Sequence, residues 1–401
     1  MKSYMTKNEV EAPINSSILV WARKSSGMEI EDVIQKLGKK IQRLNKELLN
    51  SWETGDQYPT LKQLQILADL YKRPLASFFL TRIPLEEPLP KDFRTLDSKR
   101  AYRLTHRIRF AIRWARRVQK ISSSLLTDIN KEYKFKYQKY LLSEDPISLS
   151  EKIRSDFNYS KETQLKLKTE NDAFEYLRAK IEGTGVIILK TPSQYSFPVD
   201  QARALSFVDR EPYVILINNK DLTCAKIFSL IHEFAHLLIR ETSLCNTEYI
   251  DSNNSTFLEK TEVFCNQFAS NFLVPDQLIK SYNLKSILLE EDAYLDVTLN
   301  QLSHEFKVSK HVILRKLLDL NLINSNIYRN KVASWRNNKL PRGKQFGKNV
   351  PSINALKTNG LKYSGLVLEA YKNDRITYSD ASDYLNLKSK YLPQLEHLVF
   401  E

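Results

Sequence analysis

The sequence predicts an α+β protein that is mainly helical and contains one small antiparallel sheet. Most of the chain carries apolar residues at helical intervals, whereas the stretch from about residue 184 to 218 alternates and is rich in β-branched residues. With 401 residues the chain is too long for one ordinary core, so we expect several domains. We place a helical bundle at 13–81, a basic helical connector at 82–145, an α+β domain at 146–280 and a helical domain at 281–401.

Composition excludes several classes of protein. Hydrophobic residues make up 42% of the chain, which is enough for packed cores and excludes general disorder. The net charge of +14 would attract phosphate backbones or acidic proteins, although solvated lysine faces produce the same charge. Cys224, Cys245 and Cys265 lack the CxxC spacing of a zinc ribbon and cannot form a paired disulfide framework. No apolar run is long enough for a signal peptide or a membrane span, so we expect a cytoplasmic protein.

Residues 17–80 are predicted to form a compact module of short amphipathic helices. Gly27, Gly38 and Gly55 stand where helices are expected to end, and Pro59 with Thr60 opens the last helix. The successive segments are ILVWARKSSG, EIEDVIQKLG, KKIQRLNKELLNSWETG and PTLKQLQILADLYKRPLASFF.

A basic helix is predicted from Asp97 to about Ile121. Between Arg94 and Lys120 there are ten basic residues and one acidic residue. This helix is either a solvated surface helix with one packed face, or a surface that binds phosphates or an acidic partner. The apolar positions expected to be buried are Ile108, Ile112, Ala115 and Val118.

The periodicity changes in the middle of the chain. A helix AFEYLRAKIEG is followed by three predicted strands, TGVIILKTP, RALSFVD and YVILIN, and the short REP link predicts a hairpin between the last two. Two helices are expected next, Thr223 to about Ile239 and about Ser255 to Leu273. The remainder is predicted to be helical: 299–320 is similar to a helix-turn-helix, and 361–395 predicts two or three helices.

Residues 232–236 spell HEFAH within the apolar run IFSLIHEFAHLLI. Positions i and i+4 share one face of a helix, so His232 and His236 can direct both ring nitrogens at one cation. Glu233 is offset by one residue, which keeps its carboxylate beside such a cation, where it can polarise a bound water. Two unliganded imidazoles and a carboxylate would be costly to bury in so apolar a helix.

A catalytic zinc site needs three protein ligands and an open fourth position. The next histidine after His236 is His304, so we expect the third ligand to be a carboxylate. Glu241 lies at the end of the same helix and cannot easily return over the metal, whereas a second antiparallel helix can supply a ligand. On that helix Glu262 shares a stripe with Cys265, Asn266 and Ala269. The full set of candidates is Glu241, Glu248, Asp251, Glu259 and Glu262.

The segments LINNKDLTCAKIFSLIHEFAHLLI and EVFCNQFASNFLVP resemble the ImmA/IrrE metallopeptidases, whose paired motifs are HExxH and ExxxNxFAxxxLxP. The resemblance implies a zincin-like core similar to that of thermolysin, with Zn²⁺ held by His232, His236 and Glu262, and Glu233 as the catalytic base. The second motif corresponds here to Glu262, Asn266, Phe268, Ala269, Leu273 and Pro275.

The resemblance also extends loosely to the rest of the chain. WARKSSG, WETGDQYPTLKQLQILA and RPLASFF are similar to helix-turn-helix repressors of the xenobiotic-response-element type, although the segment 38–51 is longer than in those repressors. DFR and VSKHVILRKLLDLNLI complete the similarity to a subgroup of the peptidase family that carries such a module.

These resemblances imply a zinc endopeptidase that cleaves a specific protein, expected to be a helix-turn-helix repressor, and thereby regulates genes or a mobile element. The alternative is a DNA-binding regulator whose peptidase-like domain is a sensor or scaffold, with DNA bound by 17–80 or by the basic helix at 94–120. An extended substrate would pair with a sheet edge, for which Arg203–Asp209 is the candidate strand.

Overall fold

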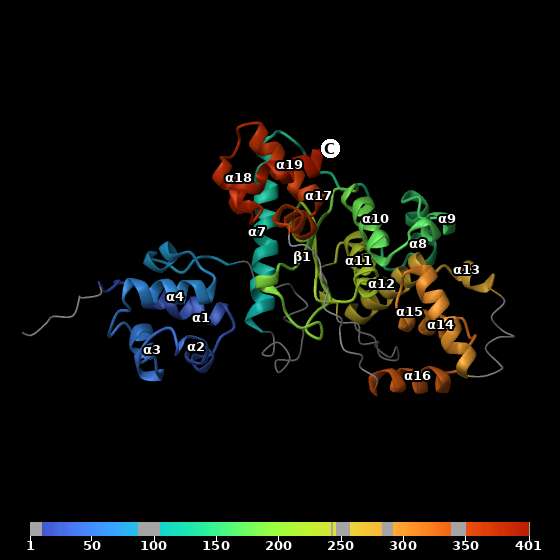
Figure 1. Cartoon of the computed structure of the whole chain (residues 1–401), viewed down its shortest axis with the longest axis horizontal. Coiled ribbons are helices and arrows are strands. Elements are labelled where there is room, and N and C mark those ends of the chain that lie inside the picture. The colour runs from blue at the N-terminus through green and yellow to red at the C-terminus, as the bar shows by residue number, and fades with distance from the viewer. Residues whose placement is uncertain are drawn as a thin grey trace, which may run out of the picture. The chain divides into compact units, whose positions relative to one another are not determined.

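The computed structural model describes residues 10–86, 105–241, 244–245, 257–282, 292–337 and 350–400. Its contacts divide the chain into two compact units, Met1–Leu89 with Phe93–Trp114, and Pro90–Asp92 with Ala115–Glu401. The described residues form many helices and one small sheet (Figure 1), so the predicted α+β, mainly helical class is confirmed. None of the described helices is both long and apolar enough to cross a bilayer.

The first unit contains the predicted succession of short helices. These are α1 (Ser16–Ser25), α2 (Ile30–Leu37), α3 (Lys46–Thr54), α4 (Leu61–Tyr71) and η1 (Leu75–Phe79). Gly55 ends α3 with φ of 87°, a conformation that glycine adopts without strain. Trp52 and Phe78 are fully enclosed in the core of the unit. The Arg23 guanidinium ties α1 to α3 by donating to Glu53 from Nε at 2.7 Å and Nη2 at 2.9 Å.

Helix α7 (His106–Asp128) corresponds to the predicted basic helix but has other bounds. Residues 97–104, where the prediction began, lie outside the described residues, and the expected end near Ile121 was wrong. The helix continues because Leu125 is buried and Ser122 Oγ donates to Val118 O, so the serine-rich stretch remains helical. The predicted apolar face is buried, as Ile108, Ile112, Ala115 and Val118 show.

The second unit contains a four-stranded sheet in the order β1-β3-β2-β4. Its strands are β1 (Ile187–Lys190), β2 (Ala204–Phe207), β3 (Val214–Ile217) and β4 (Leu244–Cys245). The predicted hairpin is confirmed, because β2 and β3 pair antiparallel. The expectation of a purely antiparallel sheet was wrong, because β1 pairs in parallel with β3. The chain crosses from β1 through η2 (Ser193–Tyr195) to β2 before it returns to the position beside β1.

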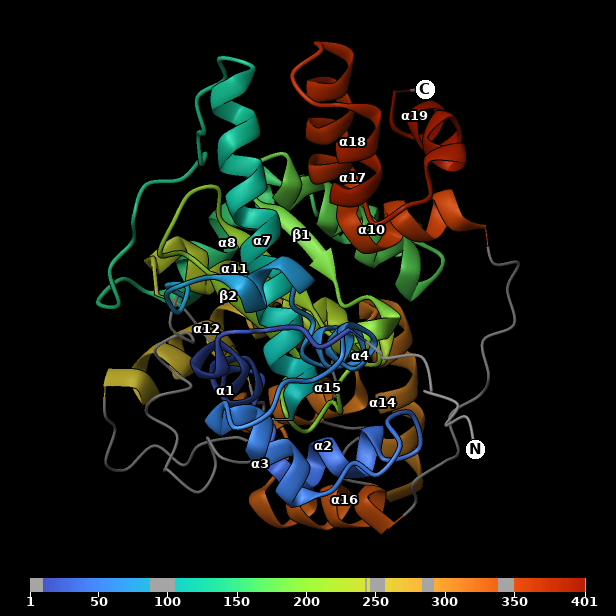
Figure 2. The ribbon, with the colours of Figure 1, turned by 90° about the vertical axis from the view of Figure 1, so that its left-hand side faces the viewer.

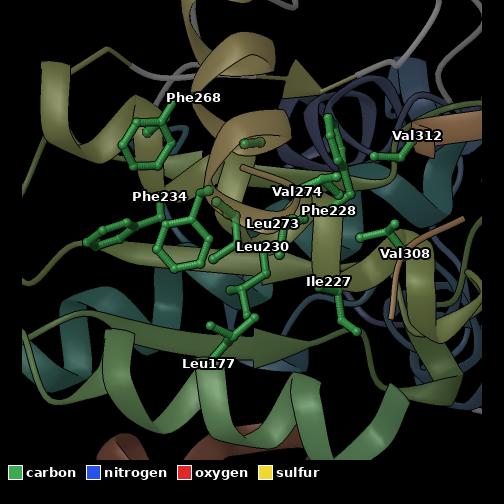
Figure 3. Close-up of a cluster of buried hydrophobic side chains, with 14 of the residues drawn as sticks. Leu177, Ile227, Phe228, Leu230, Phe234, Phe268, Leu273, Val274, Val308 and Val312 are labelled. Carbon is green, nitrogen blue, oxygen red and sulfur yellow. The ribbon is translucent and has the colours of Figure 1, made fainter. Parts of the chain in front are cut away.

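Helices of six to 17 residues enclose the core of the second unit. The first four are α8 (Pro146–Asp156), α9 (Lys161–Lys166), α10 (Glu170–Glu182) and α11 (Thr223–Ile239), and α12 (Phe257–Leu273) packs on both α8 and α11. Every residue of α11 from Ile227 to Ile239 is buried. Figure 3 shows the cluster formed by Leu177 of α10, Leu230 and Phe234 of α11, and Phe268 of α12.

The predicted helix pair at 299–320 is present as α14 (Asp292–Phe306) and α15 (Lys310–Asp319). It follows α13 (Asp276–Lys280) and precedes α16 (Ser325–Asn337), which packs on α15. Helix α15 buries Ile313, Leu314 and Leu317, and His311 contacts the Trp335 ring of α16. Since most side chains of α15 are buried or partly buried, this helix forms part of the core of the unit.

The last group of helices packs through α17 against an edge of the sheet. They are α17 (Pro351–Lys372), α18 (Tyr378–Tyr384), η3 (Ser389–Tyr391) and α19 (Leu392–Phe400). Figure 2 shows α17 close to β1 and α10, with which it is in contact. At the edge, Arg178 donates to Ile188 O at 2.6 Å and to Lys357 O at 2.8 Å. Helix α17 therefore covers the free edge of β1 and protects it from unwanted strand pairing.

Gly360 forms a kink within α17, and its substitution is expected to have a large effect on stability. Its φ of 80° and ψ of 165° lie outside the helical region, and an added Cβ would meet the Glu182 carboxylate and lie 2.7 Å from Ile188 O. We expect Gly360→Ala to destabilise the fold by about 2–4 kcal/mol, from backbone strain and overpacking. Thermal unfolding followed by circular dichroism measures this change.

Gly365, on the same helix, is the matched control for Gly360. It adopts no left-handed φ, and the nearest atom to an added Cβ is Val399 Cγ1 at 3.7 Å. Gly365→Ala is therefore expected to stabilise the protein by roughly 0.5–1 kcal/mol through its higher helix propensity. Equal changes in unfolding temperature for the two variants would contradict the role given to the kink.

Candidate metal centre

Helix α11 places three chemically active side chains inside the second unit. Its sequence is apolar on all sides, so the helix is buried along most of its length. His232, Glu233 and His236 share this burial, with exposed fractions of 0%, 0% and 1%. The Phe228 ring, one turn before His232, lies beside that imidazole with 6.3 Å between ring centroids. An apolar shell of this kind excludes water and strengthens electrostatic interactions within it.

Helix α12 brings Glu262 to the two imidazoles. The His232 Nε2 atom lies 3.1 Å from His236 Nε2 and 3.3 Å from Glu262 Oε2. The His236 Nε2 atom lies 3.3 Å from Glu262 Oε1. In the described part of the chain, these three residues form a group whose possible ligand atoms all lie within 4.8 Å of one another. The packing of the two helices thus brings together His236 and Glu262, which are 26 positions apart in the sequence.

The protonation states of these groups follow from their surroundings. Burial alone would raise the pKa of Glu262, but the hydrogen bonds and charges of His232 and His236 outweigh it and hold that pKa well below its usual range. Burial lowers the pKa of His236, although the Glu262 carboxylate opposes this effect. A charged carboxylate and a neutral imidazole are the forms in which both groups can bind a metal.

The donor set and its spacing fit zinc. Two imidazole nitrogens and one carboxylate are a common ligand set for catalytic zinc, and they leave a fourth position open. With bonds of about 2.0–2.1 Å and tetrahedral angles, ligand atoms stand about 3.3 Å apart. The separations of 3.1, 3.3 and 3.3 Å agree with this value. The Nδ1 atoms of both histidines have no hydrogen-bond partner among the described residues.

The other carboxylate candidates are placed differently. Glu241 follows Arg240, the left-handed residue that ends α11, and Glu259 stands in the first turn of α12. Neither belongs to the group with metal-binding spacing in the described residues. Glu248 and Asp251 lie outside the described residues. Cys265 is fully buried, as expected of a small packing residue, and the partly exposed Asn266 makes no side-chain hydrogen bond with a described residue.

Two buried polar side chains, Arg154 and Gln164, form hydrogen bonds to the C-terminal end of α12, and the sequence analysis did not predict them. Arg154 of α8 donates to Phe272 O at 2.5 Å and to Gln164 Oε1 at 2.9 Å. The Gln164 amide donates to Leu273 O and to Phe306 O, each at 3.0 Å. These bonds satisfy carbonyls that a helix end leaves unpaired, and they position the helix that carries Glu262. No local pattern in the sequence signals them, because the partners are far apart along the chain.

The proposed edge strand at Arg203–Asp209 requires a correction. Strand β2 lies between β3 and β4, and Ala204 and Leu205 pair with Cys245 and Leu244. These two residues are therefore not at an edge. β4 covers them because the chain returns to the sheet directly after α11, which the strand pattern alone does not reveal.

Comparison with known proteins locates a family match around this site. Residues 183–318 match the family model described as the IrrE N-terminal-like domain, Peptidase_M78. The match runs from before β1, through α11 and α12, to residue 318 within α15, and it confirms the resemblance to the ImmA/IrrE peptidases over that range. No curated protein and no solved structure matches the chain. The match supports a function of the metallopeptidase type for the second unit.

Proposed function

We propose that this chain, whose residues 183–318 match a peptidase family, is a zinc-dependent endopeptidase. The proposal is carried by the meeting of His232, His236 and Glu262, which come from two packed helices. Their ring nitrogens and carboxylate oxygens lie 3.1–3.3 Å from one another. Glu233 adjoins this group on α11. The buried carboxylate of Glu233 thus stands beside a ligand set of two imidazoles and one further carboxylate. This arrangement is suited to metal-assisted hydrolysis.

The chemistry divides between the metal and the chain. Zinc, when bound by His232, His236 and Glu262, supplies a Lewis acid that lowers the pKa of water and stabilises the oxyanion. Glu233 takes a proton from the water that attacks the peptide carbonyl, and it returns that proton to the leaving amine. The apolar residues around α11 limit access of further water to the reacting groups.

The substrate is expected to bind as an extended strand. Strand β4 lies at the end of the strand order opposite to β1, whose edge α17 covers. It also directly follows the helix that carries the two histidines. A substrate that adds to this end of the sheet would gain main-chain hydrogen bonds and lie along the catalytic helix.

We further propose that the substrate is one specific protein, a helix-turn-helix repressor. The resemblance to the ImmA/IrrE peptidases motivates the repressor, and the appended helical regions motivate the selectivity. A docked substrate presents one chosen bond to the metal at high local concentration. Through the first unit or the C-terminal helices, recruitment would thus restrict cleavage, which would regulate gene expression or a mobile element.

Mass spectrometry of new protein termini tests this substrate proposal. We expect the wild type, expressed together with candidate repressors, to produce a small set of new termini in one repressor. The Glu233→Gln variant should produce none, and unfolded casein should remain nearly intact. Broad degradation by the wild type alone would reject the selectivity and retain the chemistry. Equal patterns of termini for the wild type and Glu233→Gln would reject the peptidase.

The alternative function is a DNA-binding regulator that uses the second unit as a sensor or scaffold. The net charge of +14 favours it. The two functions are distinguished by the biological effect of the Glu233→Gln variant. A peptidase loses its regulatory effect with this single change, whereas a DNA-binding regulator keeps it. Binding to DNA is compatible with both functions.

A further inference from the structure

A cavity of about 580 Å³ lies in the second unit between β1, the C-terminal end of α10, α17 and α19. Figure 2 shows α10 and β1 beside α17, and these three elements are in contact. No described residue of α11 or α12, the helices that carry the candidate metal ligands, lines this cavity. Its volume falls within the roughly 300–1,000 Å³ of pockets that bind small molecules. The cavity is therefore a second candidate binding site, separate from the metal centre.

Gly365 leaves part of this cavity unfilled. It lines the cavity from within α17, and the nearest atom to an added Cβ is Val399 Cγ1 at 3.7 Å. Glycine lowers the stability of a helix interior relative to alanine, and the described residues make no contact at this position that excludes a side chain. The missing side chain thus leaves space that a bound molecule can occupy.

Apolar side chains form most of the cavity wall. Ile187 and Leu366 are buried, with exposed fractions of 2% and 9%. Leu361 and Phe400 remain half-exposed, at 49% and 50%. The Lys372 ammonium lies 4.2 Å from the centre of the Phe400 ring, and this cation–π contact holds the ring in place. A molecule with an apolar body would cover the half-exposed side chains, and their burial favours binding.

Two of the acidic residues in the cavity wall are paired with cations. Lys131 Nζ lies 2.5 Å from Glu369 Oε1. The buried Glu182 has its Oε1 atom 3.4 Å from Arg178 Nε, and its carboxylate accepts a hydrogen bond from the backbone N–H of Lys362 at 3.4 Å. Because both carboxylates are neutralised, they add little negative charge to the inside of the cavity.

Three other charged side chains line the cavity and make no ion pair with a described residue. They are Lys134, Lys362 and Glu132, and all three are exposed. Two positive charges and one negative charge leave an excess of one positive charge at the exposed rim of the cavity. The rim therefore favours a ligand with a negatively charged group.

We propose that this cavity binds an organic carboxylate with an alkyl or aryl body. The body would lie against Ile187, Leu366 and the half-exposed side chains, and the carboxylate would meet the ammonium groups of Lys134 and Lys362. Most of the affinity comes from burial of the body, because ion pairs at an exposed rim contribute little. The charge instead selects an anion over a cation of the same shape.

Isothermal titration calorimetry of the full chain with straight-chain carboxylates tests the proposal. From hexanoate to octanoate to decanoate, we expect the affinity to rise about fourfold for each added methylene group, since each is removed from water. Octyltrimethylammonium has a similar apolar body and the opposite charge. It should bind roughly tenfold more weakly than octanoate, because the two free lysines repel it.

A carboxylate could also bind a metal ion, so the metal centre needs its own control. The titration is repeated after chelation of the metal. The affinity for octanoate should be unchanged, because no described residue of α11 or α12 lines the cavity. Loss of binding on chelation would assign the carboxylate to the metal centre and overturn the proposal. The proposal does not depend on peptidase activity, so failure of either leaves the other intact.

Matched variants locate the site. Gly365→Leu fills the cavity and should weaken octanoate binding at least roughly tenfold without lowering the Tm. Lys134→Gln with Lys362→Gln should weaken octanoate binding about tenfold and leave the affinity for octanol unchanged, because only the charge contact is lost. Lys139→Gln with Lys220→Gln removes the same charge from exposed positions outside the cavity and should change neither affinity.

Three further results would overturn the proposal. The first is an absence of decanoate binding up to about 1 mM, a weak affinity that burial of a ten-carbon chain should exceed. The second is equal affinity for octanoate and octyltrimethylammonium. The third is an equal effect of the two double lysine variants on octanoate binding. If Gly365→Leu does not fold, the lysine variants and the chain-length series still decide the result.

Discussion

Glu233→Gln is expected to abolish peptide hydrolysis while zinc binding and folding remain. The substitution keeps the shape of the side chain and removes only its ability to take a proton. Loss of a positioned general base lowers a rate by about 10²–10⁴-fold, and here the same group also returns the proton to the leaving amine. The cleavage rate of the identified substrate, measured by mass spectrometry, and the zinc content, measured by elemental analysis, check this result together.

Glu241→Gln is the matched control for this prediction. Glu241 follows the end of the same helix and is partly exposed, and it belongs to no metal-binding group in the described residues. Its variant should therefore retain full activity. A fully active Glu233→Gln variant would contradict the proposed mechanism, whereas loss of zinc from Glu233→Gln would show that this carboxylate acts as a ligand.

The second large effect is expected on metal content. The wild type should bind about one zinc per chain, and His232→Ala, His236→Ala and Glu262→Ala should each lose most of it, because a three-ligand site with one ligand removed binds zinc weakly. Elemental analysis after gel filtration measures the metal-to-protein ratio. Chelation should remove the metal from the wild type and stop hydrolysis, and added zinc should restore both.

Glu259→Ala serves as the control for the metal prediction. Glu259 stands on α12 one turn before Glu262, but it does not belong to the group with metal-binding spacing. Its variant should retain zinc at the wild-type ratio. If Glu259→Ala lost the metal and Glu262→Ala kept it, the assignment of the third ligand would be wrong. Circular dichroism of each variant separates loss of a ligand from loss of the fold.

Several elements of the fold were predictable because their signals are local. The sequence predicts a helix from Thr223 to about Ile239, and α11 has these bounds. Continuous apolar periodicity and the polar residues before it define such a helix within one segment. The β2–β3 hairpin was predictable for the same reason, since its two strands are separated by a short link.

Other elements depend on contacts between distant segments. The parallel pairing of β1 with β3 and the pairing of β4 with β2 set the strand order. A strand pattern identifies a strand but not its neighbour, so the sheet was predicted as antiparallel. Helix α17 covers the edge of β1, and the kink at Gly360 makes this possible. The sequence does not show that a glycine is required there, because the requirement comes from Glu182 and Ile188, which are close to Gly360 only in the folded chain.

The candidate site shows the same division. The i, i+4 spacing alone determined that His232 and His236 share one face of a helix, since 3.6 residues make one turn. Among the carboxylate candidates, spacing excluded Glu241 but did not select Glu262 without a family resemblance. Only the packing of α12 against α11 brings Glu262 to within 3.3 Å of both imidazoles. The physical reason is that helix periodicity acts within one turn, whereas the crossing of two helices depends on all the side chains between them.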